Sequence, residues 1–439
     1  MCAARTAAVT AATHTSIYFV DRLPTALAAP TMRSVGLQSG LTRAHVLGAG
    51  ALGTLWAAHL AAAGVKTTLL LRRRPPTEKM RLHCVAASSA SATVDLEHID
   101  GPGRPITTLI VATKAFDVRA AIASVMPRLD HGAPSAVIYL GNGALAMADD
   151  LRLPPTTTLL AATTTHGARL LAPPAPPLSS SSALDGCQLP VQTVVHSARG
   201  HTWVGEFPRR GGGHAADGGQ AEDAAVAAAA SAARLSHGLG AVDASVAARE
   251  RADKLLMARR RRVERALRGF AGTGLGAEVE SLEATERRLW LSLAASAALQ
   301  PLTALWDVQT AAVLERLEGR HLVRETVREI SALALALAAR GLSTAAPSAE
   351  ECDAWCWRVA ASPFLADQVD SRTMDDDSSP MWVDFRRRNA RTEIEELNGW
   401  VVARASALGL PCVHNAWLAR SIRKSAGIGG AAGQARGVR

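Results

Sequence analysis

Three glycines near the start of the chain have the spacing of a phosphate-binding turn. Gly48, Gly50 and Gly53 form the pattern G-x-G-x-x-G. In such a turn the first glycine permits a tight bend, the second lets the backbone approach a pyrophosphate, and the third lets a helix pack closely on a strand. The free N–H groups at the start of that helix bind the pyrophosphate. We therefore expect Ala51 and Leu52, inside the turn, to contact a dinucleotide as well.

Three consecutive arginines follow at the position where the ribose of the dinucleotide is expected. An NAD site usually offers a carboxylate about 20 residues after the turn, whereas this chain has Arg72, Arg73 and Arg74 with no acid beside them. A guanidinium pairs well with a 2′-phosphate. Arg72 and Arg73 therefore favour NADP over NAD, with a solvated basic turn as the alternative.

The sequence around these residues predicts a strand, a turn, a helix and a second strand. Residues 44–47 and 66–71 have the apolar character of buried strands, and residues 52–63 that of a helix ended by Gly64. Three more strands, separated by helices, are predicted at residues 107–113, 136–140 and 158–164. This alternation is typical of a parallel, doubly wound sheet.

Three chemically useful side chains stand at the ends of those later strands. They are Lys114, Asn142 and His166. In a parallel sheet of this kind, ligands bind at the carboxyl ends of the strands. The strand-end side chains are therefore expected to face the dinucleotide and its substrate.

The second half of the chain reads as almost wholly helical. Helices are predicted at residues 283–299, 309–339, 349–360 and 389–408, and Pro301 and Gly341 are expected to end the first and the second of them. We expect an α/β fold in which an N-terminal Rossmann domain (44–206) precedes an all-helical C-terminal domain (283–426), as in proteins that resemble 6-phosphogluconate dehydrogenase. The active site would be the cleft between the two domains.

The remaining segments connect or flank these domains. Residues 171–182 are a Pro/Ser-rich loop, and residues 192–197 and 201–204 are predicted to form a terminal hairpin. Residues 207–282 are interpreted as an insertion or linker with an alanine-rich helix (224–234) and a second helix (246–268). The arginine run 259–262 on that second helix is interpreted as a solvated face. Residues 427–439 are a flexible tail.

Composition limits the partners and the compartment. The 439 residues are 48% hydrophobic and 20% charged, with a net charge of +9, which suits a globular protein with a sizeable core and an anionic ligand. Basic residues are spread along the chain, which argues against nucleic acid, and no window of 18 apolar residues predicts a membrane span. The six cysteines show no metal-binding spacing and indicate a reducing, intracellular compartment. Residues 1–43 resemble a mitochondrial presequence or a disordered leader, so the protein is expected in the cytoplasm or the mitochondrion.

Several short motifs, in this order along the chain, are similar to those of the ketopantoate reductase (2-dehydropantoate 2-reductase) family, in particular its fungal-type members. The resemblance covers residues 44–206 and 283–426. The motifs are GAGALG at 48–53, LLLRR at 69–73, TKAFDV at 113–118, GNG at 141–143, TTTHGAR at 163–169, HTWVGE at 201–206, PLTALWD at 301–307, Ser378-Ser379 before Met381, and RTEIEELNG at 391–399.

The resemblance implies an activity and roles for particular residues. The family reduces ketopantoate to pantoate with NADPH, a step of pantothenate and coenzyme A biosynthesis. By resemblance, Asn142 lies near nicotinamide and substrate, and Lys114 lies close to the cofactor. Ser379, or its neighbour Ser378, binds the substrate carboxylate, and Glu393 orients the reacting hydroxyl. A strand-end surface lysine and a solvated helix acid are the alternatives for Lys114 and Glu393. The resemblance also suggests a homodimer.

The sequence departs from the family on the helix before PLTALWD. The family has a proton-donating lysine there, two residues after a tryptophan, and two asparagines on the same helix face. Ser292, Ser296 and Gln300 replace them. Ser296 and Gln300 still offer hydrogen bonds to a substrate, but serine is too weak an acid to replace lysine. General acid catalysis is typically worth about 10²–10⁴-fold in rate.

Three hypotheses follow from this departure. The first is a ketopantoate reductase in which Lys114 is the best-placed substitute proton donor and Lys254 is a second candidate. The second is a catalytically impaired NADP-binding homologue. The third is a reductase of another 2-keto acid.

Overall fold

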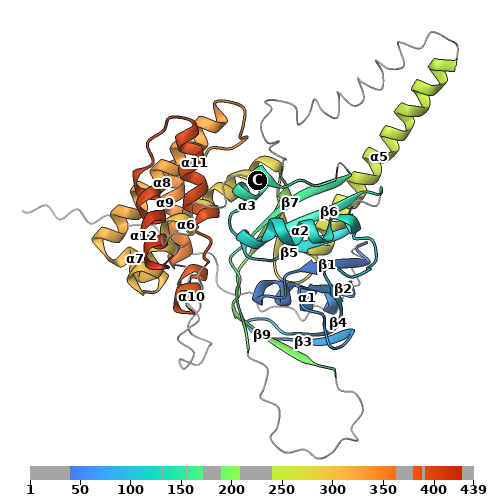
Figure 1. Ribbon diagram of the computed structural model, residues 1–439, viewed down its shortest axis with the longest axis horizontal. Coiled ribbons are helices and arrows are strands. Elements are labelled where there is room, and N and C mark those ends of the chain that lie inside the picture. Colours follow the sequence, from blue (N-terminus) through green and yellow to red (C-terminus); the bar gives the residue numbers. More distant parts are fainter. Residues whose placement is uncertain are drawn as a thin grey trace, which may run out of the picture. The chain divides into compact units, whose positions relative to one another are not determined.

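The computed structural model describes residues 40–129, 132–154, 156–171, 189–207, 240–361, 379–387 and 391–427 (Figure 1). Outside these ranges lie residues 1–39 of the leader, most of the Pro/Ser-rich loop, the predicted alanine-rich helix at 224–234, Ser378 and the last residues of the chain. The strands are β1 (Arg43–Leu47), β2 (Lys66–Leu71), β3 (Lys79–Ala86), β4 (Ala90–His98), β5 (Thr108–Val111), β6 (Ser135–Leu140), β7 (Thr157–Thr164), β8 (Gly167–Leu170), β9 (Val191–Ala198), β10 (Thr202–Glu206) and β11 (Ala277–Val279).

One mixed sheet contains all eleven of these strands. Their order is β11-β10-β7-β6-β5-β1-β2-β4-β3-β9-β8, and the stretch from β7 to β4 is parallel throughout. The five strands predicted from the sequence all lie in this parallel part, which confirms the Rossmann-like first half. Helices α1 (Ala51–Ala62), α2 (Ala115–Leu129) and α3 (Ala144–Asp150) follow β1, β5 and β6.

The edges of the sheet differ from the prediction. Strands β3 and β4 were not expected, and they pair antiparallel with each other. The predicted hairpin of residues 192–197 and 201–204 is wrong, because β9 pairs with β3 and β8, while β10 pairs with β7 and β11. Each strand finds its partner far along the chain, and this tertiary pairing overrides the short connection between β9 and β10.

The helix that follows the glycine turn is enclosed by the fold. Every residue from Gly53 to Leu60 in α1 is buried, so this part of the helix is covered on all sides. It packs against β1 to β4 and against β8 and β9. Trp56 also stacks on Phe270 of helix α5 (Gly240–Ala271), with ring centroids 3.8 Å apart. These contacts fix the position of α1 relative to the ends of the strands.

The second half of α5 belongs to the core. Val263, Ala266 and Phe270 are buried in the same cluster as β1. The predicted solvated arginine face is only partly correct: residues 260 and 261 are exposed, but Arg259 and Arg262 are half-buried, and Arg259 Nε donates to Thr158 Oγ1 at 2.8 Å. These two side chains face the packed side because the helix lies along the sheet.

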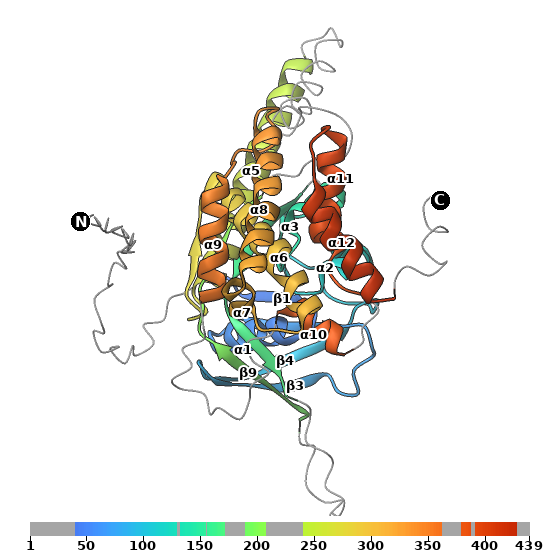
Figure 2. The ribbon, with the colours of Figure 1, turned by 90° about the vertical axis from the view of Figure 1, so that its left-hand side faces the viewer.

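The second half of the chain is helical, as predicted, and is organised around one long helix. That helix, α6, contacts α8, α9, α10 and α12 and runs between α9 and α12 (Figure 2). Of the described helices, α6 alone is long and apolar enough to cross a membrane, but 83% of its apolar window is buried inside the protein, as in a core helix. The elements are α6 (Leu282–Trp306), α7 (Thr310–Glu315), α8 (Leu317–Ala338), α9 (Ala349–Ala361), α10 (Pro380–Arg386), the π-helical η1 (Glu395–Gly399), α11 (Trp400–Ala407) and α12 (Val413–Ser425).

Two predicted helix boundaries are wrong. Helix α6 continues through Pro301 to Trp306, although proline lacks the N–H that the carbonyl four residues earlier needs. The Asn398 side chain supplies that donor: its Nδ2 lies 2.9 Å from the Ala297 carbonyl oxygen. The predicted helix at 309–339 is in fact two helices, because Arg316 has an extended backbone (φ −84°, ψ 139°) between α7 and α8.

Candidate active site

The three glycines of the turn differ in the space around them. Gly48 has φ +107°, and a Cβ on it would lie 2.8 Å from the Ala112 carbonyl oxygen. A Cβ on Gly53 would lie 1.9 Å from the carbonyl oxygen of Gly48, so this glycine brings α1 onto the turn. A Cβ on Gly50 would meet no atom within 4 Å. The turn is thus tightly packed on the protein side and open at Gly50, as a pyrophosphate site requires.

A cavity of about 1700 Å³ lies in front of this turn. Its walls come from the ends of β2, β5, β6 and β7, and from α6 and α10. It brings together residues that are far apart in the sequence: Gly48, Gly50, Ala51, Leu52, Arg72, Arg73, Lys114, Asn142, Ser292, Ser296, Gln300, Ser379 and Glu393. Of the other residues predicted for the site, Gly53 is buried behind the turn and Ser378 lies outside the described residues. His166 lines the cavity, but its ring is engaged by the protein: Nε2 donates to the Leu275 carbonyl oxygen at 2.6 Å, and Nδ1 accepts the Gly200 N–H at 3.0 Å.

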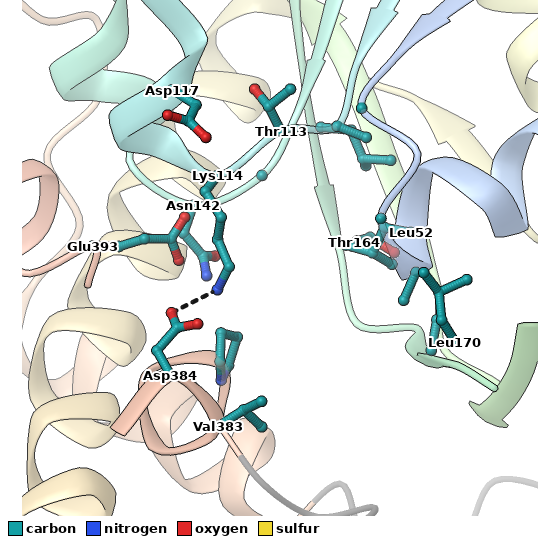
Figure 3. A pocket seen from close by; sticks show the side chains of 18 of the residues that line it. Leu52, Thr113, Lys114, Asp117, Asn142, Thr164, Leu170, Val383, Asp384 and Glu393 are labelled. Atoms are coloured by element: carbon teal, nitrogen blue, oxygen red, sulfur yellow. Dashed lines mark hydrogen bonds and ion pairs between the residues drawn. The ribbon is translucent and has the colours of Figure 1, made fainter. Parts of the chain in front are cut away.

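Glu393 is a buried carboxyl group at the side of this cavity (Figure 3). It lies in a turn directly before η1, and the helix predicted from residue 389 begins only after it. Its Oε1 accepts the backbone N–H of Ala115 at 3.0 Å, and its carboxyl group also bonds the Asn142 side chain. Burial raises the pKa of Glu393, while Lys114 and these two hydrogen bonds oppose that rise.

Asn142 is held from both ends. Its side chain contacts Glu393, and its backbone carbonyl oxygen accepts the hydroxyl of Tyr139 at 2.5 Å. Gly143, with φ +76°, turns the chain directly after it into α3. The predicted strand-end asparagine is therefore fixed at the cavity wall, where its side chain can orient a bound ligand.

Lys114 forms an ion pair within the cavity that the sequence did not indicate. Its Nζ lies 2.9 Å from Oδ2 of Asp384 on α10, and the two side chains are 38% and 9% exposed. Both residues line the cavity, and Lys114 is the only lysine that does so among the described residues. Asp384 was missed because 270 residues separate the two partners, and no local pattern connects them.

The face of α6 that departs from the family also lines the cavity. Ser292, Ser296 and Gln300 follow at intervals of four and therefore share one side of the helix. Gln300 is buried, and its Oε1 has no hydrogen-bond partner among the described residues. Buried polar atoms are normally satisfied, but this oxygen is enclosed by the protein, so the Gln300 side chain must rotate before the oxygen can accept a hydrogen bond from a ligand.

Ser379 reaches the cavity, but its hydroxyl is already engaged. It is the N-cap of α10 and accepts the backbone N–H of Trp382 at 3.2 Å. Thr303 Oγ1 donates its proton to the backbone carbonyl oxygen of Gln300 at 2.7 Å. In the 2.5 Å hydrogen bond between the hydroxyls of Ser379 and Thr303, Ser379 is therefore the donor. Before this serine can bind a substrate carboxylate, it must exchange one of these bonds.

The arginines after β2 have an acidic neighbour in space. Arg72 and Arg73 line the cavity, whereas Arg74 does not. Arg72 Nη1 lies 3.3 Å from Oδ2 of Asp117, in the first turn of α2. The sequence showed no acid beside the arginines, but the TKAFDV motif contains Asp117 and the parallel sheet places α2 next to the end of β2. Arg72 is thus held by an ion pair, whereas Arg73 forms none among the described residues and is the more available of the two for a ligand.

Comparisons with known proteins agree with this arrangement. The sequence model described as "Ketopantoate reductase PanE/ApbA" matches residues 44–209, and that described as "Ketopantoate reductase PanE/ApbA C terminal" matches residues 284–426. A 2-dehydropantoate 2-reductase of Vibrio cholerae is 34% identical over 102 residues, which are 23% of this chain and 32% of that protein. The match thus spans about a third of the length of this curated relative.

Solved structures share the fold over nearly their whole length. A PanE/ApbA family ketopantoate reductase from Ralstonia eutropha JMP134 has a TM-score of 0.56 at 20% identity, over 88% of this chain and 99% of that one. A D-mandelate dehydrogenase in a ternary structure with NADH and anilino(oxo)acetate has a TM-score of 0.56 at 14% identity, with the same coverage. At these identities the likeness concerns the fold.

Proposed function

The chain belongs to the ketopantoate reductase family, and we propose that it reduces 2-dehydropantoate to pantoate with NADPH, a step of pantothenate and coenzyme A biosynthesis. The observation that carries this proposal is the single cavity in which the glycine turn meets Lys114, Asn142 and Glu393. An oxidoreductase needs these two parts, a dinucleotide site and a polar reaction site, within reach of each other. Assembly as a homodimer is part of the proposal and is tested by the molecular mass in solution.

NADP is proposed as the cofactor because of the glycine turn and the arginines. The open space at Gly50 fits a pyrophosphate, and Arg72 and Arg73 offer guanidinium groups for a 2′-phosphate. Bound NADPH supplies the hydride that reduces the keto carbon. The residues that would hold it are Gly48, Gly50, Ala51, Leu52, Arg72 and Arg73, with Asn142 and Lys114 at the nicotinamide end.

The protein's own task is to protonate the keto oxygen and to fix the substrate. As the carbon–oxygen π bond opens, its electron pair moves to the oxygen, and the ammonium of Lys114 transfers one proton to it. Water returns that proton to the lysine. Asn142, held by Glu393, orients the reacting oxygen. Ser296, Gln300 and Ser379 line the part of the cavity where the remaining polar groups of the substrate would bind.

The serine at position 292 favours two competing functions. It lines the cavity on α6 where the family has its proton-donating lysine. If Lys114 does not replace that lysine, the chain is an impaired homologue that binds NADP without turnover. The small side chains of Ser292 and Ser296 also leave room for a different 2-keto acid.

The test measures NADPH binding and NADPH oxidation by the purified protein. We expect binding and a slow but measurable oxidation with 2-dehydropantoate. Lys114→Met should reduce the rate by about 10²–10⁴-fold, and adding Ser292→Lys to that variant should recover at least tenfold. Binding without oxidation of NADPH by any 2-keto acid would support the impaired homologue. Absence of NADPH binding would contradict the proposal altogether.

A further inference from the structure

We propose that Asp384 is the positioning residue for Lys114, holding its ammonium in the cavity where the keto oxygen is protonated. This inference rests on the proposed reductase function. It starts from the 2.9 Å contact between Lys114 Nζ and Asp384 Oδ2, which joins the loop after β5 to helix α10 (Figure 3).

Lys114 needs a partner to have a defined position. Its side chain is a flexible four-carbon stem that is 38% exposed in a wide cavity. Such a stem samples many rotamers, and ordering it costs conformational entropy. A proton donor acts efficiently only within hydrogen-bond reach of the atom that it protonates. Without a fixed partner, the ammonium would spend much of its time elsewhere in the cavity.

Asp384 is well placed to supply this constraint. Its side chain is only 9% exposed. Its helix is anchored through neighbouring residues, because Trp382 Nε1 and Arg386 Nε both donate to Asp307 Oδ1, at 2.8 and 2.9 Å. The carboxylate therefore belongs to a helix that packs on α6, whereas the lysine belongs to a loop.

Two further acids near Lys114 are engaged elsewhere. Asp117 pairs with Arg72 and Arg391. Glu393 is engaged within the cavity wall, where its carboxyl group accepts the Ala115 N–H and bonds the Asn142 side chain. Glu393 thus fixes Asn142, and Asp384 fixes Lys114. Figure 3 shows the lysine side chain extending past Asn142 and Glu393 to reach Asp384.

The first experiment reads the position of Lys114 without turnover. The chain has only five lysines, Lys66, Lys79, Lys114, Lys254 and Lys424. Limiting acylation with an N-hydroxysuccinimide ester, followed by peptide mass spectrometry, gives the labelling rate of each. In Asp384→Asn we expect Lys114 to be labelled at least threefold faster, because the ion pair no longer covers its nitrogen. The four exposed lysines, which are internal controls, should keep their rates.

A matched control separates positioning from a general loss of structure. Asp149 on α3 accepts hydrogen bonds from Trp400 Nε1 at 2.7 Å and Arg404 Nε at 3.0 Å, and its side chain is 8% exposed. It lies outside the cavity lining. Asp149→Asn therefore removes a comparable buried ion pair, but it should leave the Lys114 labelling rate and kcat unchanged.

The second experiment reads kcat and KM separately. Asp384→Asn should lower kcat at least tenfold and should not raise KM for the keto acid, because the change removes a negative charge from a cavity that binds an anion. Asp384→Glu should recover part of kcat. Unchanged Lys114 labelling and kcat in Asp384→Asn would overturn the inference. If Lys114 is labelled faster in Asp384→Asn but the wild-type protein shows no turnover, the proposed function is contradicted, whereas the contact that positions Lys114 is supported.

Discussion

Asn398 compensates for Pro301 in the last two turns of the buried helix α6. The Asn398 side-chain Nδ2 donates at 2.9 Å to the carbonyl of Ala297, the group that Pro301 leaves without its helical donor. Both residues are buried. This contact lets α6 continue past the proline to Trp306, and it connects the packing of η1 to the part of α6 where Gln300 lines the cavity.

We expect Asn398→Ala to lower the free energy of unfolding by about 1–3 kcal/mol, the usual effect of leaving a buried polar group unsatisfied. In a Pro301→Ala background the backbone N–H of residue 301 can serve the Ala297 carbonyl, so the same change should cost about 1 kcal/mol less. Urea denaturation of the four proteins measures this double-mutant cycle. The bond from Asn398 to Asn415 is lost in both backgrounds and therefore cancels. Equal costs in the two backgrounds would contradict the compensation.

The glycines of the turn allow folding to be separated from cofactor binding. Gly50 has φ −73°, and a Cβ there would meet no protein atom within 4 Å. Gly50→Ala should therefore fold with a free energy of unfolding within about 0.5 kcal/mol of the wild type. Because the added methyl group occupies the space expected for the pyrophosphate, NADPH affinity should fall at least tenfold, as measured by fluorescence titration.

Gly53→Ala is the matched contrast. Its Cβ would lie 1.9 Å from the carbonyl oxygen of Gly48, so this variant should be strongly destabilised. If Gly50→Ala bound NADPH as tightly as the wild type, the pyrophosphate would not lie on this turn.

Arg73 offers a test of cofactor preference. Hydrogen bonds between charged groups contribute about 1.5–3 kcal/mol, so Arg73→Ala should weaken NADPH binding by roughly 10–100-fold and leave NADH binding nearly unchanged. Arg74→Ala is the control, because Arg74 is adjacent in sequence but does not line the cavity. Equal affinity of the wild type for the two nucleotides would contradict a role for these arginines in phosphate recognition.

The parts of the molecule that the sequence predicted are those specified locally. The glycine turn, α1 and the parallel strands follow from glycines and apolar runs within about 30 residues, and the structure has them close to the predicted bounds. The continuation of α6 past Pro301 depends on Asn398, about a hundred residues later, and could not be read from the proline itself.

The candidate site follows the same rule. Its glycines, arginines and strand-end polar residues were named from the sequence or from resemblance. The partners of Lys114 and Arg72, Asp384 and Asp117, were not, because they approach only through the tertiary fold. Strands β3 and β4 were missed for a related reason: only a few residues of each are buried, so neither forms a continuous apolar run, and β3 pairs with β9 more than a hundred residues later.

Acid should destabilise the protein through His45. This residue lies in β1 at the centre of the sheet, is 1% exposed, and neither ring nitrogen has a hydrogen-bond partner among the described residues. Burial, followed by the charges of Arg128 and Arg43, lowers the pKa of His45 to about 4. Burial and the neighbouring His166 also lower the pKa of His196 to about 4.

The direction in which pH changes the free energy of unfolding follows from proton binding. An unfolded chain protonates these histidines below about pH 6.5, whereas the folded protein resists protonation until about pH 4. The free energy of unfolding should therefore fall as the pH is lowered through this window, by roughly 3 kcal/mol per histidine at its lower end. His45→Leu removes one of these groups together with its unpaired ring nitrogens, so it should flatten the slope and raise stability at neutral pH. Urea denaturation at pH 8, 6 and 5 measures both effects, and a slope identical to that of the wild type would show that His45 is not the group responsible.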